Sequence, residues 1–158
     1  MSENQNLRYE KKTVYELAGA KVVDEAYEYA KNYVKFLDAS KTEREAVVES
    51  VRIAEAAGYR AWNFGDAINT GDKLYYNNRG KNIFLFRIGT ENINNGIRIT
   101  AAHIDSPRLD LKPVPLYEEN GMSFFKTHYY GGVRKYQWLA MPLALHGVVV
   151  KQDGTVVD

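Results

Sequence analysis

The chain has 158 residues, with 21 Lys and Arg against 20 Asp and Glu, so its formal net charge is +1. This balance gives no electrostatic support to nucleic-acid binding, and no apolar run reaches the ~18 residues of a membrane span. Cysteine is absent, which excludes disulfides and thiolate-ligated zinc. Residues 1–6 lack the basic and apolar parts of a secretory signal, so we expect a cytoplasmic protein.

Two helices are predicted in the first part of the chain. Residues 22–37 repeat apolar side chains at helical spacing, with charged residues mostly opposite. A second helix should begin within residues 40–45, because Ser40 to Glu43 and Thr42 to Glu45 both have capping-box spacing, and should end at Gly58. Its core-facing residues would be Val47, Val51 and Ala54. The short connection predicts that the two helices pack as a hairpin.

The next part of the chain changes to strand character. Strands are predicted at residues 60–64, 73–76, 82–88 and 97–100, with Gly- and Asn-rich turns between them. The run at 83–88 is almost continuously apolar, which is typical of a strand buried on both faces. Helices followed by a largely central sheet predict the α/β or the α+β class, and of these two we expect α/β with a mixed sheet.

Further β structure is expected after Pro113. A hairpin should join Leu116–Tyr117 to Met122–Lys126 around a turn at residues 118–121, and residues 138–150 should form a long strand interrupted by Pro142. A turn at 151–154 would lead into a return strand at 155–158. Because Pro113 and Pro115 interrupt the pattern, we predict two domains, residues 1–113 and 114–158.

A histidine and an aspartate stand two positions apart where the fourth strand of the sheet is predicted to end. Alternation along a strand would place the side chains of His103 and Asp105 on the same face. Imidazole is a common zinc ligand, and its second ring nitrogen usually donates to a carboxylate. The pair therefore predicts either a metal ligand with its orienting acid or a polar strand end without a ligand.

Other candidate residues have plainer interpretations. His128 reads as a histidine near a strand end, and His146 as a structural histidine within a strand. Glu118 and Glu119 are adjacent, so a strand would point them to opposite faces, and a solvated turn is favoured over an acid–base pair. Ser106 lacks the Gly-x-Ser-x-Gly setting of a serine hydrolase.

A longer string around His103 resembles a known motif. Ala102 to Pro113, Ala-His-Ile-Asp-Ser-Pro-Arg-Leu-Asp-Leu-Lys-Pro, is similar to the first metal-site motif of the aspartyl aminopeptidase and aminopeptidase I family, which are dinuclear zinc exopeptidases. Supporting segments are Tyr130-Gly131-Gly132, and Trp138 followed by Leu145 and Gly147. The likeness covers most of the chain. It departs at residues 139–142, Leu-Ala-Met-Pro, where the family has Phe-Asp-Arg-Asp.

The resemblance implies an N-terminal portion of such an enzyme. His103 would ligate one of two zinc ions, and Asp105 would belong to the catalytic site by orienting His103 or steadying the metal pair. Members hydrolyse the N-terminal peptide bond of peptides, and their remaining ligands lie in a later segment. Their peptidase domain is interrupted by a β-rich dimerisation domain, whose opening strands residues 114–158 resemble, so a homo-oligomer is implied.

Two functions are therefore open. The first is a cytoplasmic zinc aminopeptidase, present as a portion that would be inactive alone because one histidine cannot hold a catalytic zinc. The alternative is a non-enzymatic β-rich oligomerisation or binding module built on a peptidase-derived scaffold, which exposed strand edges would favour.

Overall fold

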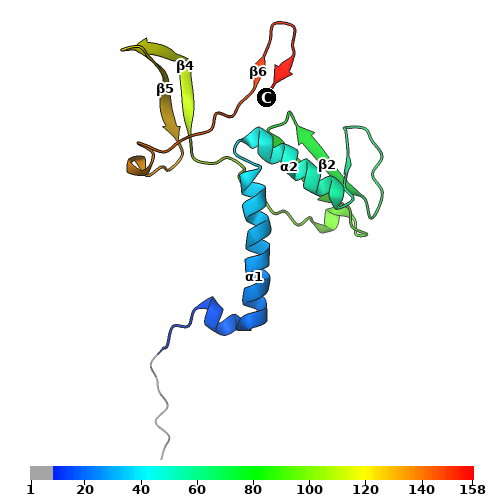
Figure 1. The fold of residues 1–158 in the computed structure, drawn as a ribbon. Helices are drawn as coiled ribbons and strands as arrows, with labels where there is room; N and C mark the ends of the chain where they lie inside the picture. The colour runs from blue at the N-terminus through cyan, green and yellow to red at the C-terminus, as the bar shows by residue number, and fades with distance from the viewer. Residues whose placement is uncertain (1–8) are drawn as a thin grey trace, which may run out of the picture. The chain divides into compact units, whose positions relative to one another are not determined.

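The computed structural model describes residues 9–158, which divide into two units that meet between Asp38 and Ala39. The first unit is helix α1, Val14–Asp38, and the second holds all the other elements (Figure 1). The prediction for residues 1–6 lies outside the described residues. Among the residues described, no helix is both long and apolar enough to cross a membrane.

Helix α1 begins earlier than the predicted residue 22. Its start is capped by Thr13, whose hydroxyl accepts from the Glu16 amide at 3.4 Å while that hydroxyl also donates to the Glu16 carboxylate at 3.0 Å. Gly19, at φ 75° and ψ 158°, kinks the helix in its second turn. No residue of α1 is buried, and α1 is a unit by itself. The predicted helical hairpin therefore stays a prediction.

Helix α2, Glu43–Ala56, begins with the second of the two capping boxes predicted. The Glu45 amide donates to the Thr42 hydroxyl at 3.3 Å, and the Thr42 amide donates to the Glu45 carboxylate at 2.8 Å. Ser40 is instead buried, with no hydrogen-bond partner for its hydroxyl among the described residues. Val47 and Ala54 face the core as predicted, at 0% and 5% exposure.

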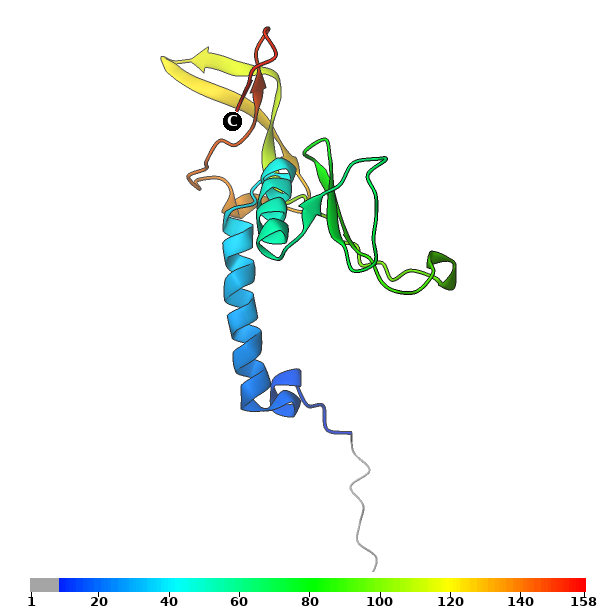
Figure 2. The same cartoon turned by 90° about the vertical axis from the view of Figure 1, so that its right-hand side faces the viewer.

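The strands after α2 form a mixed sheet in the order β1-β2-β3, whose bounds are Arg60–Ala61, Lys73–Asn78 and Asn82–Arg87. The β1 strand is parallel to β2, and β2 is antiparallel to β3 with Tyr75 opposite Leu85. Helix α2 packs against β2 and β3, as both ribbon views show (Figures 1 and 2). The Tyr75 hydroxyl donates to the Glu55 carboxylate on α2 at 2.7 Å. Helices followed by a mixed sheet confirm the predicted α/β class.

Two sequence predictions for this sheet were wrong. The β3 strand is not buried on both faces, because Phe84, Leu85 and Phe86 are 45%, 52% and 39% exposed. The opposite face of the sheet from α2 carries an aromatic cluster that includes Trp62 in edge contact with Phe86, at 6.2 Å between ring centroids. Residues 97–100 form no strand, because no described segment pairs with them. Between β3 and that segment lies a short 3-10 helix, η1, Ile93–Asn95.

A long hairpin follows, formed by β4, Arg108–Glu119, and β5, Met122–Tyr130. Its two-residue turn is Asn120-Gly121, with φ of 53° and 73°, so it is shorter than the predicted turn at residues 118–121 because β4 continues to Glu119. The register is irregular between Leu111 and Leu116, where two prolines lack the amide a ladder needs. The β4 strand runs through residues 113 and 114, and the predicted domain boundary there stays a prediction.

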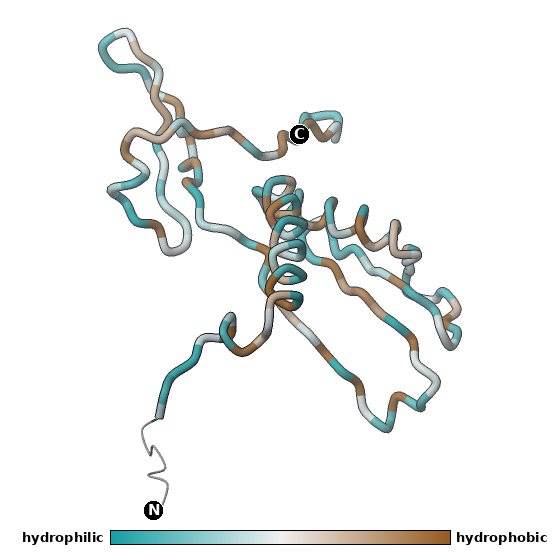
Figure 3. Tube along the Cα trace, turned by 60° about the horizontal axis from the view of Figure 1, so that its bottom comes forward, coloured by the Kyte–Doolittle hydropathy of each residue, from teal (hydrophilic) through white to brown (hydrophobic). Residues whose placement is uncertain are grey.

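The end of the chain is less regular than predicted. A short 3-10 helix, η2, Lys135–Gln137, is followed by residues 138–148 without any strand. Only Val149–Val150, β6, remains of the predicted long strand, and it pairs with the return strand β7, Val156–Val157. A strand needs a partner for its amides and carbonyls, and the described residues provide none for 138–148. Apolar positions, brown in Figure 3, lie on such irregular segments as well as on helices and strands.

Candidate metal centre

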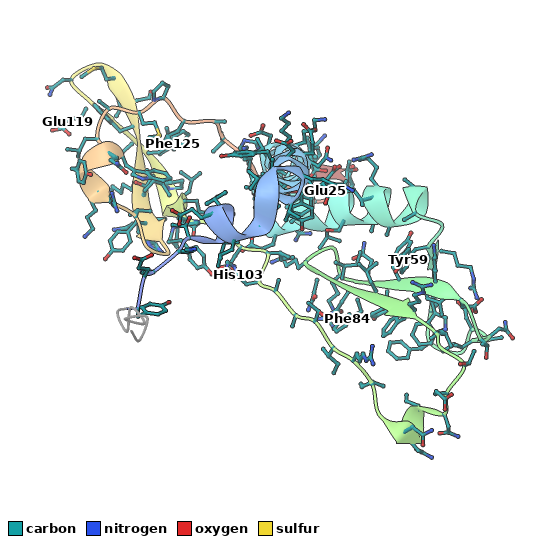
Figure 4. All side chains as sticks on the ribbon, turned by 90° about the horizontal axis from the view of Figure 1, so that it is seen from below. Glu25, Tyr59, Phe84, His103, Glu119 and Phe125 are labelled. Carbon is teal, nitrogen blue, oxygen red and sulfur yellow. The ribbon has the colours of Figure 1, made fainter. Side chains whose placement is uncertain are left out.

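His103 and Asp105 lie on an extended segment that leads into β4. Residues 97–107 form no strand, and β4 begins at Arg108, so the pair precedes a strand and does not end one as predicted. Pro107, which has no amide, stands at this junction. Figure 4 labels His103 on this segment, away from Glu119 at the tip of the hairpin. The two side chains nevertheless meet, as the sequence predicted.

The contact between them determines which imidazole nitrogen is available. His103 Nδ1 lies 2.9 Å from Asp105 Oδ1 and 3.1 Å from the backbone carbonyl oxygen of Asp105. Both oxygens are acceptors when the carboxyl is ionised, so Nδ1 must carry the proton and donate. The lone pair of a neutral ring is then on Nε2. The His103 side chain is 83% exposed, so Nε2 is accessible to a ligand from outside the described residues.

Asp105 is held from its other side by Tyr130, the last residue of β5. The Tyr130 hydroxyl donates to Asp105 Oδ2 at 2.8 Å. This bond, with the amide of Asp105 itself and His103, holds the pKa of the Asp105 carboxyl below its ordinary value. The same bond raises the pKa of the Tyr130 hydroxyl. Asp105 is therefore ionised at neutral pH and can accept from His103 and Tyr130 together.

Tyr130 is itself positioned by Arg108. The two residues are directly opposite in the β4–β5 register, and the guanidinium lies 4.2 Å from the centre of the tyrosine ring. Arg108 donates to Asp110 at 2.8 Å and to Glu43 at 3.1 Å, which links the hairpin to the start of α2. Asp110 and Glu43 keep the pKa of the guanidinium raised, so its charge is permanent.

The turn after Tyr130 depends on the glycine at position 131. Gly131 has φ 76°, and a Cβ there would lie 3.4 Å from the Cα of Pro107. Only glycine adopts this φ freely, so the chain can turn beside the segment that carries the pair. The positive φ, and not this ordinary contact distance, accounts for a glycine at position 131.

The other candidate residues lie elsewhere. The ring of His128, in β5, contacts the backbone oxygen of Tyr129 at 2.6 Å. His146 is not in a strand as predicted, and its Nδ1 lies 2.7 Å from the Glu45 carboxylate. That pair lines a hollow of about 330 Å³ at the start of α2. Glu118 and Glu119 are exposed, but they are the last paired residues of β4 and not part of the turn in which the sequence placed them.

The donors present fit one ligand of a metal site. Within residues 9–158, no three His, Asp or Glu side chains are close enough together to hold an ion. His103 offers one exposed nitrogen on a ring whose other nitrogen is bound to a carboxylate, which is the usual arrangement of a zinc-binding histidine. Sequence reasoning assigned no role to Tyr130 or Arg108, because their contacts depend on strand register.

Comparison with known proteins identifies the family to which the chain belongs. The profile of the Peptidase M18 family, described as aminopeptidase I zinc metalloprotease, matches residues 36–157. The chain belongs to the M18 family. This confirms the family resemblance drawn from the residues around His103.

The M18 proteins that this chain matches are much longer than the chain itself. A probable M18 family aminopeptidase 1 of Clostridium acetobutylicum is 45% identical over 157 residues, covering 97% of this chain and 34% of the relative. The crystal structure of the Thermotoga maritima M18 aminopeptidase superposes with a TM-score of 0.81 at 40% identity, over 95% of this chain and 32% of that one. Aminopeptidase I of Borrelia burgdorferi gives 0.80 at 37%, over 88% and 34%. The chain thus spans about a third of the M18 proteins it matches.

Proposed function

We propose that this chain is the N-terminal part of a zinc-dependent aminopeptidase that removes N-terminal residues from peptides, with His103 as a ligand to one of two zinc ions. The observation that carries the proposal is the 2.9 Å contact from His103 Nδ1 to Asp105, which leaves Nε2 exposed. Membership of a family described as zinc metalloproteases supports it.

Each residue of the pair has a distinct task in this proposal. His103 presents the lone pair of Nε2, and Asp105 keeps the proton on Nδ1 and prevents rotation of the ring. When bound, zinc supplies Lewis acidity and lowers the pKa of water at the site to ~7. Tyr130 and His103 lower the pKa of the Asp105 carboxyl, which favours the ionised form that accepts from Nδ1.

The remaining ligands and the general base would come from polypeptide that this chain does not include. Catalytic zinc normally has three protein ligands, and residues 9–158 bring no three candidates together. We therefore expect the 158-residue chain to be inactive alone. Exposed apolar residues on the hairpin, such as Val114 at 87% and Leu116 at 62%, support a homo-oligomer formed through residues 114–158 as an inserted domain. We place the protein in the cytoplasm.

The test compares the 158-residue chain with the full-length protein that carries it. Hydrolysis of a panel of dipeptide amides and zinc content should be measured for both. We expect turnover and about two zinc ions only in the full-length protein. Turnover by the short chain would refute the requirement for further ligands, and a full-length protein without zinc or turnover would refute the proposed activity.

A second function is favoured by one observation, the absence of any buried residue in the β4–β5 hairpin. A hairpin with both faces exposed suits a β-rich oligomerisation or binding module without catalysis. The gene sequence that follows codon 158 distinguishes the two functions. A continuation that encodes an Asp, a Glu-Glu pair and a His at family positions supports the enzyme, and its absence supports the module.

A further inference from the structure

We infer that Tyr130 is a positioning residue for the metal ligand, acting on His103 through Asp105. The inference rests on the proposed function, since it concerns the same site. Tyr130 lies 25 positions after Asp105 in the chain. Its hydroxyl donates to the Asp105 carboxylate, which in turn accepts from the His103 imidazole.

The three side chains form a continuous path of hydrogen bonds. Tyr130 donates to Oδ2 of Asp105 at 2.8 Å, and the other carboxylate oxygen, Oδ1, lies 2.9 Å from His103 Nδ1. Each carboxylate oxygen therefore has its own donor. A carboxylate that accepts at both oxygens cannot rotate about its Cβ–Cγ bond without losing one of them. The bond from Tyr130 to Oδ2 therefore fixes the plane of the Asp105 carboxylate at the oxygen that does not contact the imidazole.

Fixing this plane matters because the segment around His103 has little support of its own. Residues 97–107 have no strand pairing, and His103 is 83% exposed. Tyr130, in contrast, ends a strand that pairs with β4 directly opposite Arg108. The hydrogen bond from Tyr130 thus connects Asp105, on a segment without strand pairing, to the paired end of β5.

Tyr130 is in turn prevented from turning away. The Arg108 guanidinium covers its ring at 4.2 Å and is held by Asp110 and by Glu43 on α2. Because this contact uses the face of the ring, a phenylalanine at position 130 would keep it. The hydroxyl can therefore be removed without removing the packing that supports the strand end.

The experiment measures zinc affinity by chelator competition in the full-length protein, for Tyr130→Phe and for the control Tyr129→Phe. Tyr129 neighbours Tyr130 on β5, and its hydroxyl has no hydrogen bond among the described residues. Loss of a carboxylate behind a metal-bound histidine costs about 10- to 100-fold in affinity, so we expect that for Asp105→Ala and roughly 3- to 10-fold for Tyr130→Phe. Tyr129→Phe should leave the affinity unchanged.

The decisive comparison repeats Tyr130→Phe in the Asp105→Ala background. If Tyr130 acts through Asp105, its hydroxyl has no further effect there, so the double variant should bind zinc as Asp105→Ala does. A Tyr130 that only supports the fold would reduce affinity by the same factor in both backgrounds, which would overturn the inference. Equal affinities for Tyr130→Phe and Tyr129→Phe in the presence of Asp105 would overturn it as well.

A third variant separates this inference from the proposed function. If His103→Ala and Asp105→Ala lower zinc affinity while Tyr130→Phe does not, the proposed ligand stands and the role of Tyr130 is wrong. If His103→Ala binds zinc as tightly as the unchanged protein, His103 is no ligand, and both the proposed function and the role of Tyr130 fall.

Discussion

The helix–sheet region and the β4–β5 hairpin are stabilised in different ways. In the first, α2 covers β2, and Val47 and Leu74 are 0% and 1% exposed. In the hairpin no residue is buried, and its order comes from backbone pairing and from the Asn120-Gly121 turn. The first region therefore depends on side-chain burial within this chain. The second has apolar side chains that residues 9–158 leave exposed.

The candidate metal centre lies where these two regions are joined. His103 and Asp105 precede β4, Tyr130 ends β5, and Arg108 connects the hairpin to Glu43 of α2. A site assembled from both regions needs each to be in place. The hydrogen bonds of Arg108 and Tyr130 are therefore important for the site, because they connect its residues to both regions.

The largest effect should come from truncating the core. Leu74→Ala should lower the free energy of unfolding of the 158-residue chain by about 2 to 5 kcal/mol, since Leu74 is 1% exposed and its truncation leaves a cavity. Leu116→Ala, at a side chain that is 62% exposed on the hairpin, should change it by less than about 0.5 kcal/mol. Urea denaturation measures both. Equal losses would show that the hairpin is as well packed as the core.

A smaller effect is expected at the start of α2. Thr42→Ala removes the hydroxyl that accepts from the Glu45 amide, and should cost about 1 kcal/mol. Thr42→Ser should recover most of this loss, because serine caps equally well. Thr100→Ala, on the irregular segment, serves as the control. A loss at Thr42 that serine does not recover would point to the methyl group and not to the cap.

How well the sequence predicts a feature depends on whether neighbouring residues alone determine that feature. The Thr42–Glu45 box and the Asn120-Gly121 turn depend on neighbouring residues, and both were predicted, the turn as part of residues 118–121. The burial of β3 and the strands at 97–100 and 138–148 were wrong, because each needs a covering or pairing segment that the described residues lack. His103 and Asp105 meet because they are two positions apart. Tyr130 could be found only from the β4–β5 register.

A modest effect is expected where the two regions are connected. Arg108→Met removes the contacts to Glu43 and Asp110, whose side chains are partly exposed, so the loss should be roughly 1 kcal/mol or less. Arg52→Met is the matched control, because its pair with Glu49 is exposed and lies within α2 alone, so the loss should be smaller. Urea denaturation compares them. A smaller loss for Arg108 than for Arg52 would contradict the connecting role.

The smallest effect concerns pH. Burial raises the pKa of the Glu45 carboxyl, but hydrogen bonds from His146 and Thr42 outweigh it and the pKa is lowered. A lowered pKa stabilises the fold above the ordinary value of about 4.3, and this stabilisation is lost as the pH falls through the folded value. The difference in urea midpoint between the unchanged chain and Glu45→Gln should therefore be present at about pH 6 and shrink towards about pH 3.

Glu118→Gln is the control for this profile, because the Glu118 carboxylate has no hydrogen-bond partner in the described part of the chain. Its urea midpoint should follow that of the unchanged chain at both pH values. A difference for Glu45→Gln that grows on acidification would show that burial, and not the hydrogen bonds, controls the carboxyl.

The central claim is that His103 binds zinc through Nε2 because Asp105 holds Nδ1. A crystal structure of the full-length protein, with anomalous scattering recorded at the zinc edge, tests it most directly. We expect an anomalous peak about 2.0 to 2.1 Å from His103 Nε2, with Nδ1 still donating to Asp105. A zinc peak ligated without His103, or ligated through its Nδ1, would contradict it.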